Sequence, residues 1–239
     1  MEYWVQIKNS WNIAVKLFRY NLKIIFANKF FFFLTAAVIF FLFVTTINLF
    51  SDSNPTEGTV YYLLIFPGLL LIFYPMTFGI QNDVDTRMIE ILFGIPNYRY
   101  KVWLVRMVLI YIVVSVILFV LSLISTFALV SVPAFEMVYQ LMFPIFFLGS
   151  LAFMFSTLVR NGYGTAVVMV IIGLAFWISS GILENSKWNI FLNPFRIPSD
   201  MNETIWMSIT LDNRIFLAVG TILTILYGLL NLQKREKFI

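Results

Sequence analysis

The sequence contains no cysteine and no histidine, and charged residues make up only 12% of it. Without thiolates or imidazoles, zinc centres, haem ligation, cysteine nucleophiles and serine–histidine chemistry are all disfavoured. A soluble domain needs charge on about a quarter of its residues. The shortage of charge therefore excludes a soluble enzyme and predicts that the chain resides in a membrane.

Apolar residues dominate the composition: 61% of the 239 residues are hydrophobic, and the mean hydropathy is +0.90. Phenylalanine alone accounts for 27 residues. A helix needs roughly 20 apolar residues to cross a hydrocarbon core of about 30 Å. Six stretches qualify: 30–50, 60–80, 102–130, 137–159, 163–183 and 215–230. Lipid offers no partner to an open backbone, and the stretches lack the alternation of a barrel strand. We expect an all-α integral membrane protein with six transmembrane helices.

The distribution of lysine and arginine predicts the orientation, because these residues are retained on the cytoplasmic side. Thirteen of the 16 basic residues lie before the first stretch, in the second and fourth connections, or in the tail, if Arg106 just beyond the second connection is counted with it. The remaining connections hold only Lys187, Arg196 and Arg214, against seven acidic residues. Both termini are therefore expected in the cytoplasm, with the chain spanning the plasma (inner) membrane several times. This asymmetry explains the net charge of +4 better than nucleic-acid binding does.

The first 29 residues form a region of their own. Bulky apolar residues beginning with Trp4, Ile7 and Trp11 recur every three or four positions, and a cationic flank that includes Lys8 and Lys16 accompanies them. This pattern predicts an amphipathic helix in the cytoplasmic headgroup layer over 1–29, before a six-helix membrane domain over 30–239.

The six stretches contain no ionisable residue apart from Arg106 at the entrance of the third. Ion-coupled carriers and pumps usually keep such groups inside the membrane. No pair of catalytic residues lies within the stretches either, so an enzyme is not expected. The chain also lacks the Gly-Lys pair of a phosphate-binding loop, so any uphill transport must draw its energy from another polypeptide.

The second connection, residues 81–101, is the best candidate for contact with such a partner. Asp83 and Asp85 open it, and an amphipathic turn around Glu90 follows, ended by Pro96. The basic residues Arg99, Lys101 and Arg106 come last, which suits the helix dipole.

This connection resembles that of the type-2 permease family, the membrane subunits of ABC exporters. In the family an acid is followed by Gly-Thr-Leu-Glu, two leucines, a proline, Ser-Arg and a later lysine. The corresponding residues here are Arg87-Met88-Ile89-Glu90, Ile91-Leu92, Pro96, Tyr98-Arg99 and Arg106. Arg87, Met88, Tyr98 and Arg106 depart from the family pattern, but spacing and charge order are kept.

The resemblance implies a short coupling helix that docks in a groove of an ATP-binding subunit. The expected ATPase-coupling residues are Asp83, Asp85, Met88, Ile89, Glu90, Leu92, Pro96, Arg99 and Arg106. It also implies that a second copy, or a paralogue, completes a twelve-helix exporter. A homodimer is the simpler arrangement. No cofactor is expected on this chain, because ATP and Mg²⁺ would bind the partner ATPase.

The cargo and the class of function leave alternatives. If the spans surround a central transport path, its lining would be aromatic and free of charge. Such a lining favours an amphiphilic or hydrophobic substrate such as a lipid, a peptide or a drug. A sodium exporter of the same family is a second possibility. A membrane scaffold or immunity protein that sequesters a partner without transport is a third, and the charges of the connection would then serve only solvation and topology.

The last long connection, residues 184–214, mixes aromatic and polar residues, with Pro194 and Pro198 dividing it. Such a composition predicts interfacial or re-entrant helices at the outer leaflet. In an exporter they would cap the exit of the transport path.

Overall fold

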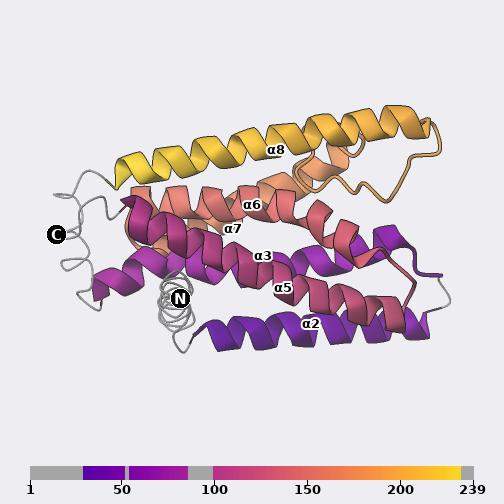
Figure 1. Cartoon of the computed structure of the whole chain (residues 1–239), viewed down its shortest axis with the longest axis horizontal. Helices are drawn as coiled ribbons and strands as arrows, with labels where there is room; N and C mark the ends of the chain where they lie inside the picture. Colours follow the sequence, from indigo (N-terminus) through magenta and orange to yellow (C-terminus); the bar gives the residue numbers. More distant parts are fainter. Residues whose placement is uncertain (1–28, 52–53, 86–98, 233–239) are drawn as a thin grey trace, which may run out of the picture.

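A computed structural model describes residues 29–51, 54–85 and 99–232. All regular structure in these stretches is helical, and six helices are long and apolar enough to cross a membrane (Figure 1). They are α2 (Phe30–Phe50), α3 (Glu57–Asp85), α5 (Val105–Ala128), α6 (Ala134–Val159), α7 (Gly162–Ile182) and α8 (Glu203–Asn231). A π-helical turn, η1 (Arg99–Leu104), leads directly into α5. For the described residues, the predicted all-helical fold with six candidate spans is confirmed.

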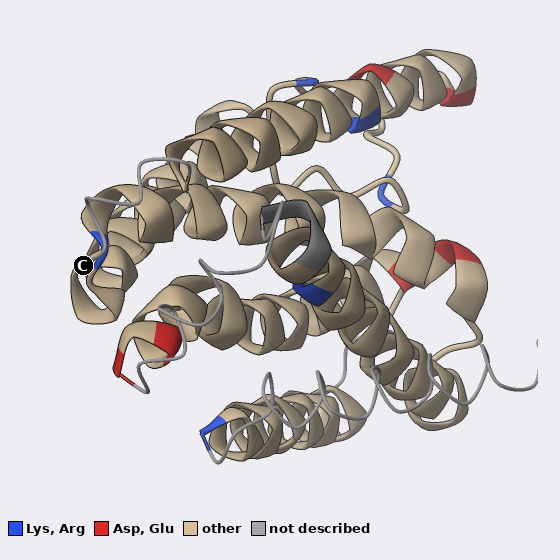
Figure 2. Cartoon of the chain, turned by 60° about the vertical axis from the view of Figure 1, so that its left-hand side comes forward, with Lys and Arg blue, Asp and Glu red and all other residues tan. Residues whose placement is uncertain are grey.

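The helices alternate in direction between two ends of the bundle (Figure 1). We call one the loop end, because α3 finishes there before residues 86–98, and the other the cap end. Residues 183–202, which we call the cap segment, lie at the cap end and consist of turns and irregular chain. Among the described residues, charges occur only toward the two ends, and the middles of the helices carry none (Figure 2).

The centre of the bundle is formed by α3 and α6. α3 packs against α2, α5, α6 and α7, and α6 packs against α3, α5, α7 and α8. Glycines allow the close approach: an added Cβ would lie 2.6 Å from Ile72 at Gly149 and 2.7 Å from Phe147 at Gly220. Membrane helices associate through such packing because lipid is as apolar as their side chains.

Hydrogen bonds fix the register of α6 and α8, which run in the same direction. Ser150 and Thr224 hydroxyls lie 2.7 Å apart, and Asn231 donates to the carbonyl of Thr157 at 2.6 Å. Both contacts join residues separated by 74 positions, so the two helices stay in step over their length.

α7 lies at the edge of the bundle. Of its 21 residues only Gly162, Thr165 and Met169 are buried. Bulky apolar side chains such as Trp177 and Ile178 are more than two-thirds exposed. In a membrane this face contacts lipid or another protein.

Two predicted boundaries are wrong. The last span begins at Glu203 rather than near residue 215, so Trp206 and its neighbours belong to the first turns of α8. Of the predicted interfacial or re-entrant segment 184–214, residues 184–202 form turns and irregular chain rather than helices, and residues 203–214 are the start of α8. Buried hydrogen bonds from Asn213 hold those turns and satisfy backbone groups that a helix would otherwise satisfy internally. The predicted in-plane helix over 1–29 lies outside the described residues, except for Lys29.

Candidate functional site

A buried ion pair joins α3 to α5 at the loop end. Nη1 of Arg106 lies 2.8 Å from Oδ2 of Asp83, and the two side chains are 6% and 5% exposed. The guanidinium also lies over the ring of Trp103, 4.7 Å from its centroid. Residues 86–98 connect the two helices. Both flanks of the predicted coupling segment are therefore fastened to each other inside the protein.

A second set of contacts joins α3 to α7 at the same end. The side chain of Gln81 donates to Oδ1 of Asp85 at 2.7 Å and accepts from the backbone N–H of Gly162 at 3.2 Å. Ser156 of α6 donates to the backbone carbonyl of Thr77 at 3.0 Å. The loop end of α3 is thus bonded to α5, α6 and α7.

The structure separates the predicted coupling residues into two groups. Asp83 and Arg106 are buried in the ion pair, and Asp85 is the exposed last residue of α3. Arg99 opens η1, and its side chain is outside the description. Outside the described residues lie Met88, Ile89, Glu90, Leu92 and Pro96. Burial favours an internal role for Asp83 and Arg106, whereas the contact role of the others stays a prediction.

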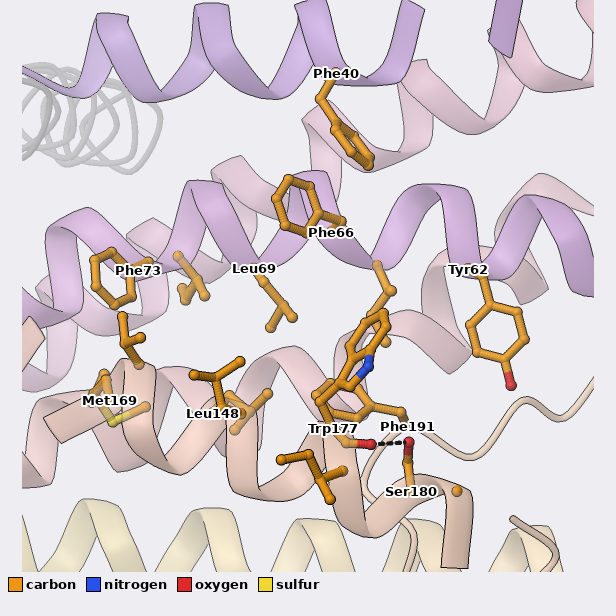
Figure 3. Close-up of a pocket in the computed structure, with 18 residues that line it drawn as sticks. Phe40, Tyr62, Phe66, Leu69, Phe73, Leu148, Met169, Trp177, Ser180 and Phe191 are labelled. Carbon is orange, nitrogen blue, oxygen red and sulfur yellow. Dashed lines mark hydrogen bonds between the residues drawn. The ribbon is translucent and has the colours of Figure 1, made fainter. Parts of the chain in front are cut away.

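A large apolar groove, which sequence reasoning did not find, lies between α2 and α3 on one side and α6 and α7 on the other (Figure 3). Its volume is about 970 Å³, at the upper end of the range for small-molecule pockets. None of the described residues that line it is charged. The lining includes Phe40, Tyr62, Phe66, Leu69, Phe73, Leu148, Met169, Trp177, Ser180 and Phe191. Such a groove accepts hydrocarbon and offers nothing to a hydrated ion.

Two glycines keep the groove open beside Trp177. Gly173 and Gly181 stand four residues before and after it on α7, and both line the groove. An added Cβ at either position would meet nothing within 4 Å. This differs from Gly149 and Gly220, which are packed against neighbouring helices. Glycine costs a helix about 1 kcal/mol relative to alanine, and no packing against the described residues accounts for it here.

At the cap end Arg214 of α8 is 95% buried, yet it forms no ion pair with a described carboxylate. Its Nε donates to Oε1 of Gln140 at 2.8 Å, and its Nη1 donates to Oδ1 of Asn213 at 2.8 Å. Its Nη2 donates to the carbonyl of Leu192 at 3.3 Å, and Phe143 lies under the guanidinium at 5.5 Å. Neutral oxygens and a ring thus hold this cation.

The cap segment is fastened by side chains rather than by regular structure. Asn213 donates to the carbonyls of Lys187 and Asn189, both at 2.8 Å. Asn193 donates to the carbonyl of Gly58 at 2.9 Å, which joins the segment to the start of α3. Trp206 adds a bond from its indole N–H to the carbonyl of Pro194 at 3.0 Å.

Chemically, the described residues offer a charged tie, an apolar groove and a hydrogen-bonded cap. They contain no group of three or more acidic side chains placed to hold a metal ion. Comparison of the chain with protein-family models, with curated proteins and with solved structures gave no match.

Proposed function

We propose that this chain is the membrane subunit of an ATP-driven exporter of the ABC type-2 permease class. Separate ATPase subunits would bind ATP and Mg²⁺. They would move the helices of this chain by pushing on residues 86–98. The pattern of acid, amphipathic turn, proline and base in this region supports the proposal. A second copy would complete the exporter.

The buried pair of Asp83 and Arg106 is the observation that carries the proposal. A segment that receives a push must be attached rigidly at both ends, or the movement is absorbed locally. Here the two flanking helices are tied by a short ion pair, and α3 is bonded in turn to α6 and α7. Displacement of the segment would therefore move several helices together.

The proposed orientation places the loop end in the cytoplasm. Most basic residues of the chain lie before α2, between α3 and α5, or after α8, all of them at that end of the predicted topology. Around the cap end, the described residues include six carboxylates and three cations. Retention of positive charge inside then puts both termini in the cytoplasm and the cap segment outside.

The proposed cargo is an amphiphilic or hydrophobic molecule. The groove lined by Phe66, Met169 and Trp177 supports this class, because its surface is apolar and free of charge. Proline residues at 67 and 75 interrupt the hydrogen bonding of α3 alongside the groove, which makes this wall the place where the helix bends most easily.

The proposal is tested by co-purifying the chain with a candidate ABC ATPase from the same genome and measuring ATP turnover in lipid nanodiscs. Glu90→Ala and Arg99→Glu should lower turnover at least severalfold, since both change charged contacts of the coupling segment. Glu136→Ala and Lys187→Glu, exposed at the cap end, are the matched controls and should leave turnover unchanged. A stable assembly with unchanged turnover in both loop variants would count against the proposal.

A further inference from the structure

The cap end of the groove is bridged by a pair of opposite charges. Arg196 of the cap segment lies beside Gly58 of α3, because a Cβ added at Gly58 would be 3.4 Å from the Cβ of Arg196. Gly58 is one helical turn before Tyr62, which lines the groove. Glu184 follows Ser180 by four residues, just past the end of α7. Nη1 of Arg196 lies 3.7 Å from Oε1 of Glu184. One charge therefore stands above each wall of the groove.

Arg196 and Glu184 interact only weakly with each other. Their side chains are 69% and 64% exposed, and the separation is long for an ion pair. Exposed pairs of this kind contribute at most about 1 kcal/mol. Both charges also lie within electrostatic reach of Tyr62, a residue that lines the groove. A ligand that carries one negative and one positive group could exchange this pair for two contacts of its own.

The groove below the pair suits hydrocarbon chains. Trp177, 68% exposed, stands in its wall with Gly173 and Gly181 on either side, and the lining carries no charge (Figure 3). A chain that moves from the bilayer into this groove gains no hydrophobic energy, because lipid is as apolar as the lining. Any preference among lipids must then come from the headgroup, which lies where Arg196 and Glu184 are.

We propose that the groove holds one zwitterionic phospholipid from the leaflet at the cap end. Its acyl chains lie beside Trp177, its phosphate pairs with Arg196 and its ammonium group pairs with Glu184. The occupant belongs to the amphiphilic class proposed as cargo, but its binding can be tested separately from transport, because occupation of the groove requires neither an ATPase nor movement of the helices.

Quenching of Trp177 fluorescence by brominated acyl chains tests the proposal. The full chain is placed in bilayers of phosphatidylglycerol, and brominated phosphatidylethanolamine replaces it in steps. The difference between the unchanged chain and Trp177→Phe isolates the signal of this residue. We expect quenching a few-fold above that set by the mole fraction of the brominated lipid. In the reverse experiment, brominated phosphatidylglycerol should quench only in proportion to its mole fraction.

Variants separate the headgroup contacts from the chain site. Glu184→Gln should remove the preference for the zwitterionic lipid without abolishing quenching, because the phosphate that pairs with Arg196 is common to both lipids and only the ammonium group distinguishes them. Gly173→Leu should lower quenching by both lipids, since its side chain enters the open space. Val167→Leu, on the exposed face of α7, is the matched control for added bulk and should change neither. Circular dichroism and a single peak in gel filtration establish that each variant is folded.

Three results would overturn the proposal: equal enrichment of the two lipids, proportional quenching by both in the unchanged chain, or unchanged quenching in Gly173→Leu. Occupation of the groove by a second copy of the chain would overturn it as well, because the second copy would shield Trp177 and lower quenching by both lipids below the proportional level. It is recognised independently by the mass of the complex, which light scattering during gel filtration measures.

Discussion

The two ends of this bundle each bury an arginine, but they hold it differently. At the loop end Arg106 faces the carboxylate of Asp83 at 2.8 Å, so the charge is neutralised by a single partner. At the cap end Arg214 is surrounded by the side-chain oxygens of Gln140 and Asn213 and by a backbone carbonyl. The first arrangement ties two helices at one point, whereas the second distributes a charge over α6, α8 and the cap segment.

The difference indicates what each end is suited to. A buried ion pair is costly to separate into two buried charges, so it keeps α3 and α5 together when the segment between them is moved. A guanidinium bonded to neutral groups can lose one contact without creating an unpaired carboxylate. The loop end therefore ties α3 to α5 at one point, and in the proposed exporter it would transmit the movement of the segment between them, whereas the cap end holds irregular chain in place. The following variants test this distinction, from the largest expected effect to the smallest.

Asp83→Asn should produce the largest loss of stability, because it leaves Arg106 buried without its counter-charge. We expect the free energy of unfolding to fall by about 3–5 kcal/mol, measured by denaturant titration in detergent. Asp85→Asn, on the exposed last residue of α3, is the matched control and should stay within about 0.5 kcal/mol. Replacing Asp83 and Arg106 together by leucine should recover most of the loss. A double variant as unstable as Asp83→Asn would show that the loss does not come from leaving Arg106 without its counter-charge.

Arg214→Met should cost less than Asp83→Asn. The substitution removes the charge itself. The groups left without a hydrogen-bond donor are neutral acceptors, including the side-chain oxygen of Gln140 and the carbonyl of Leu192. The expected loss is about 1–3 kcal/mol in the same titration. Lys187→Met is the control, because it removes a cation at the same end whose ion-pair partner is exposed. It should change the free energy of unfolding by no more than about 0.5 kcal/mol. An effect of Arg214→Met equal to that of Asp83→Asn would remove the proposed distinction between the two ends.

Asn213→Leu should loosen the cap segment while changing global stability by about 1–2 kcal/mol. The substitution leaves the carbonyls of Lys187 and Asn189 without their side-chain donor. Limited proteolysis, followed by mass spectrometry, should detect faster cleavage within residues 183–202. Cleavage at an unchanged rate would mean that other contacts hold the segment.

Gln81→Ala should have the smallest effect, about 0.5 kcal/mol, because the bonds it removes at Asp85 and Gly162 are not deeply buried. Its counterpart at the cap end is Gln140→Ala, which leaves Nε of Arg214 without an acceptor and should cost more. Thermal unfolding of the two variants gives the comparison directly. A larger loss for Gln81→Ala would indicate that the loop end relies on its surface contacts.

Sequence patterns located five of the six helices to within a few residues, since long apolar runs need no tertiary contact to be recognised. The start of α8 was wrong for a specific reason. Its first turns hold Asp212, Asn213 and Arg214, which look like a polar connection until their partners are known. The ion pair shows the same limitation, because Asp83 and Arg106 are 23 residues apart and only the packing of α3 on α5 brings them together.

The groove could not be predicted at all. Its lining residues come from four helices and the cap segment, and each of them reads as an ordinary lipid-facing or core residue in its own stretch. Gly173 and Gly181 are no different in sequence from the glycines that pack tightly, such as Gly220. Only the arrangement of the helices distinguishes a glycine beside open space from one beneath a neighbouring ring.

The sequence alone determined that this chain is helical and apolar enough to cross a membrane six times, because hydropathy and backbone hydrogen bonding are properties of continuous stretches. The tertiary structure decided which charges are buried, which glycines face open space and where a groove remains. Those features depend on contacts between residues far apart in the chain, and such contacts follow from how the helices pack.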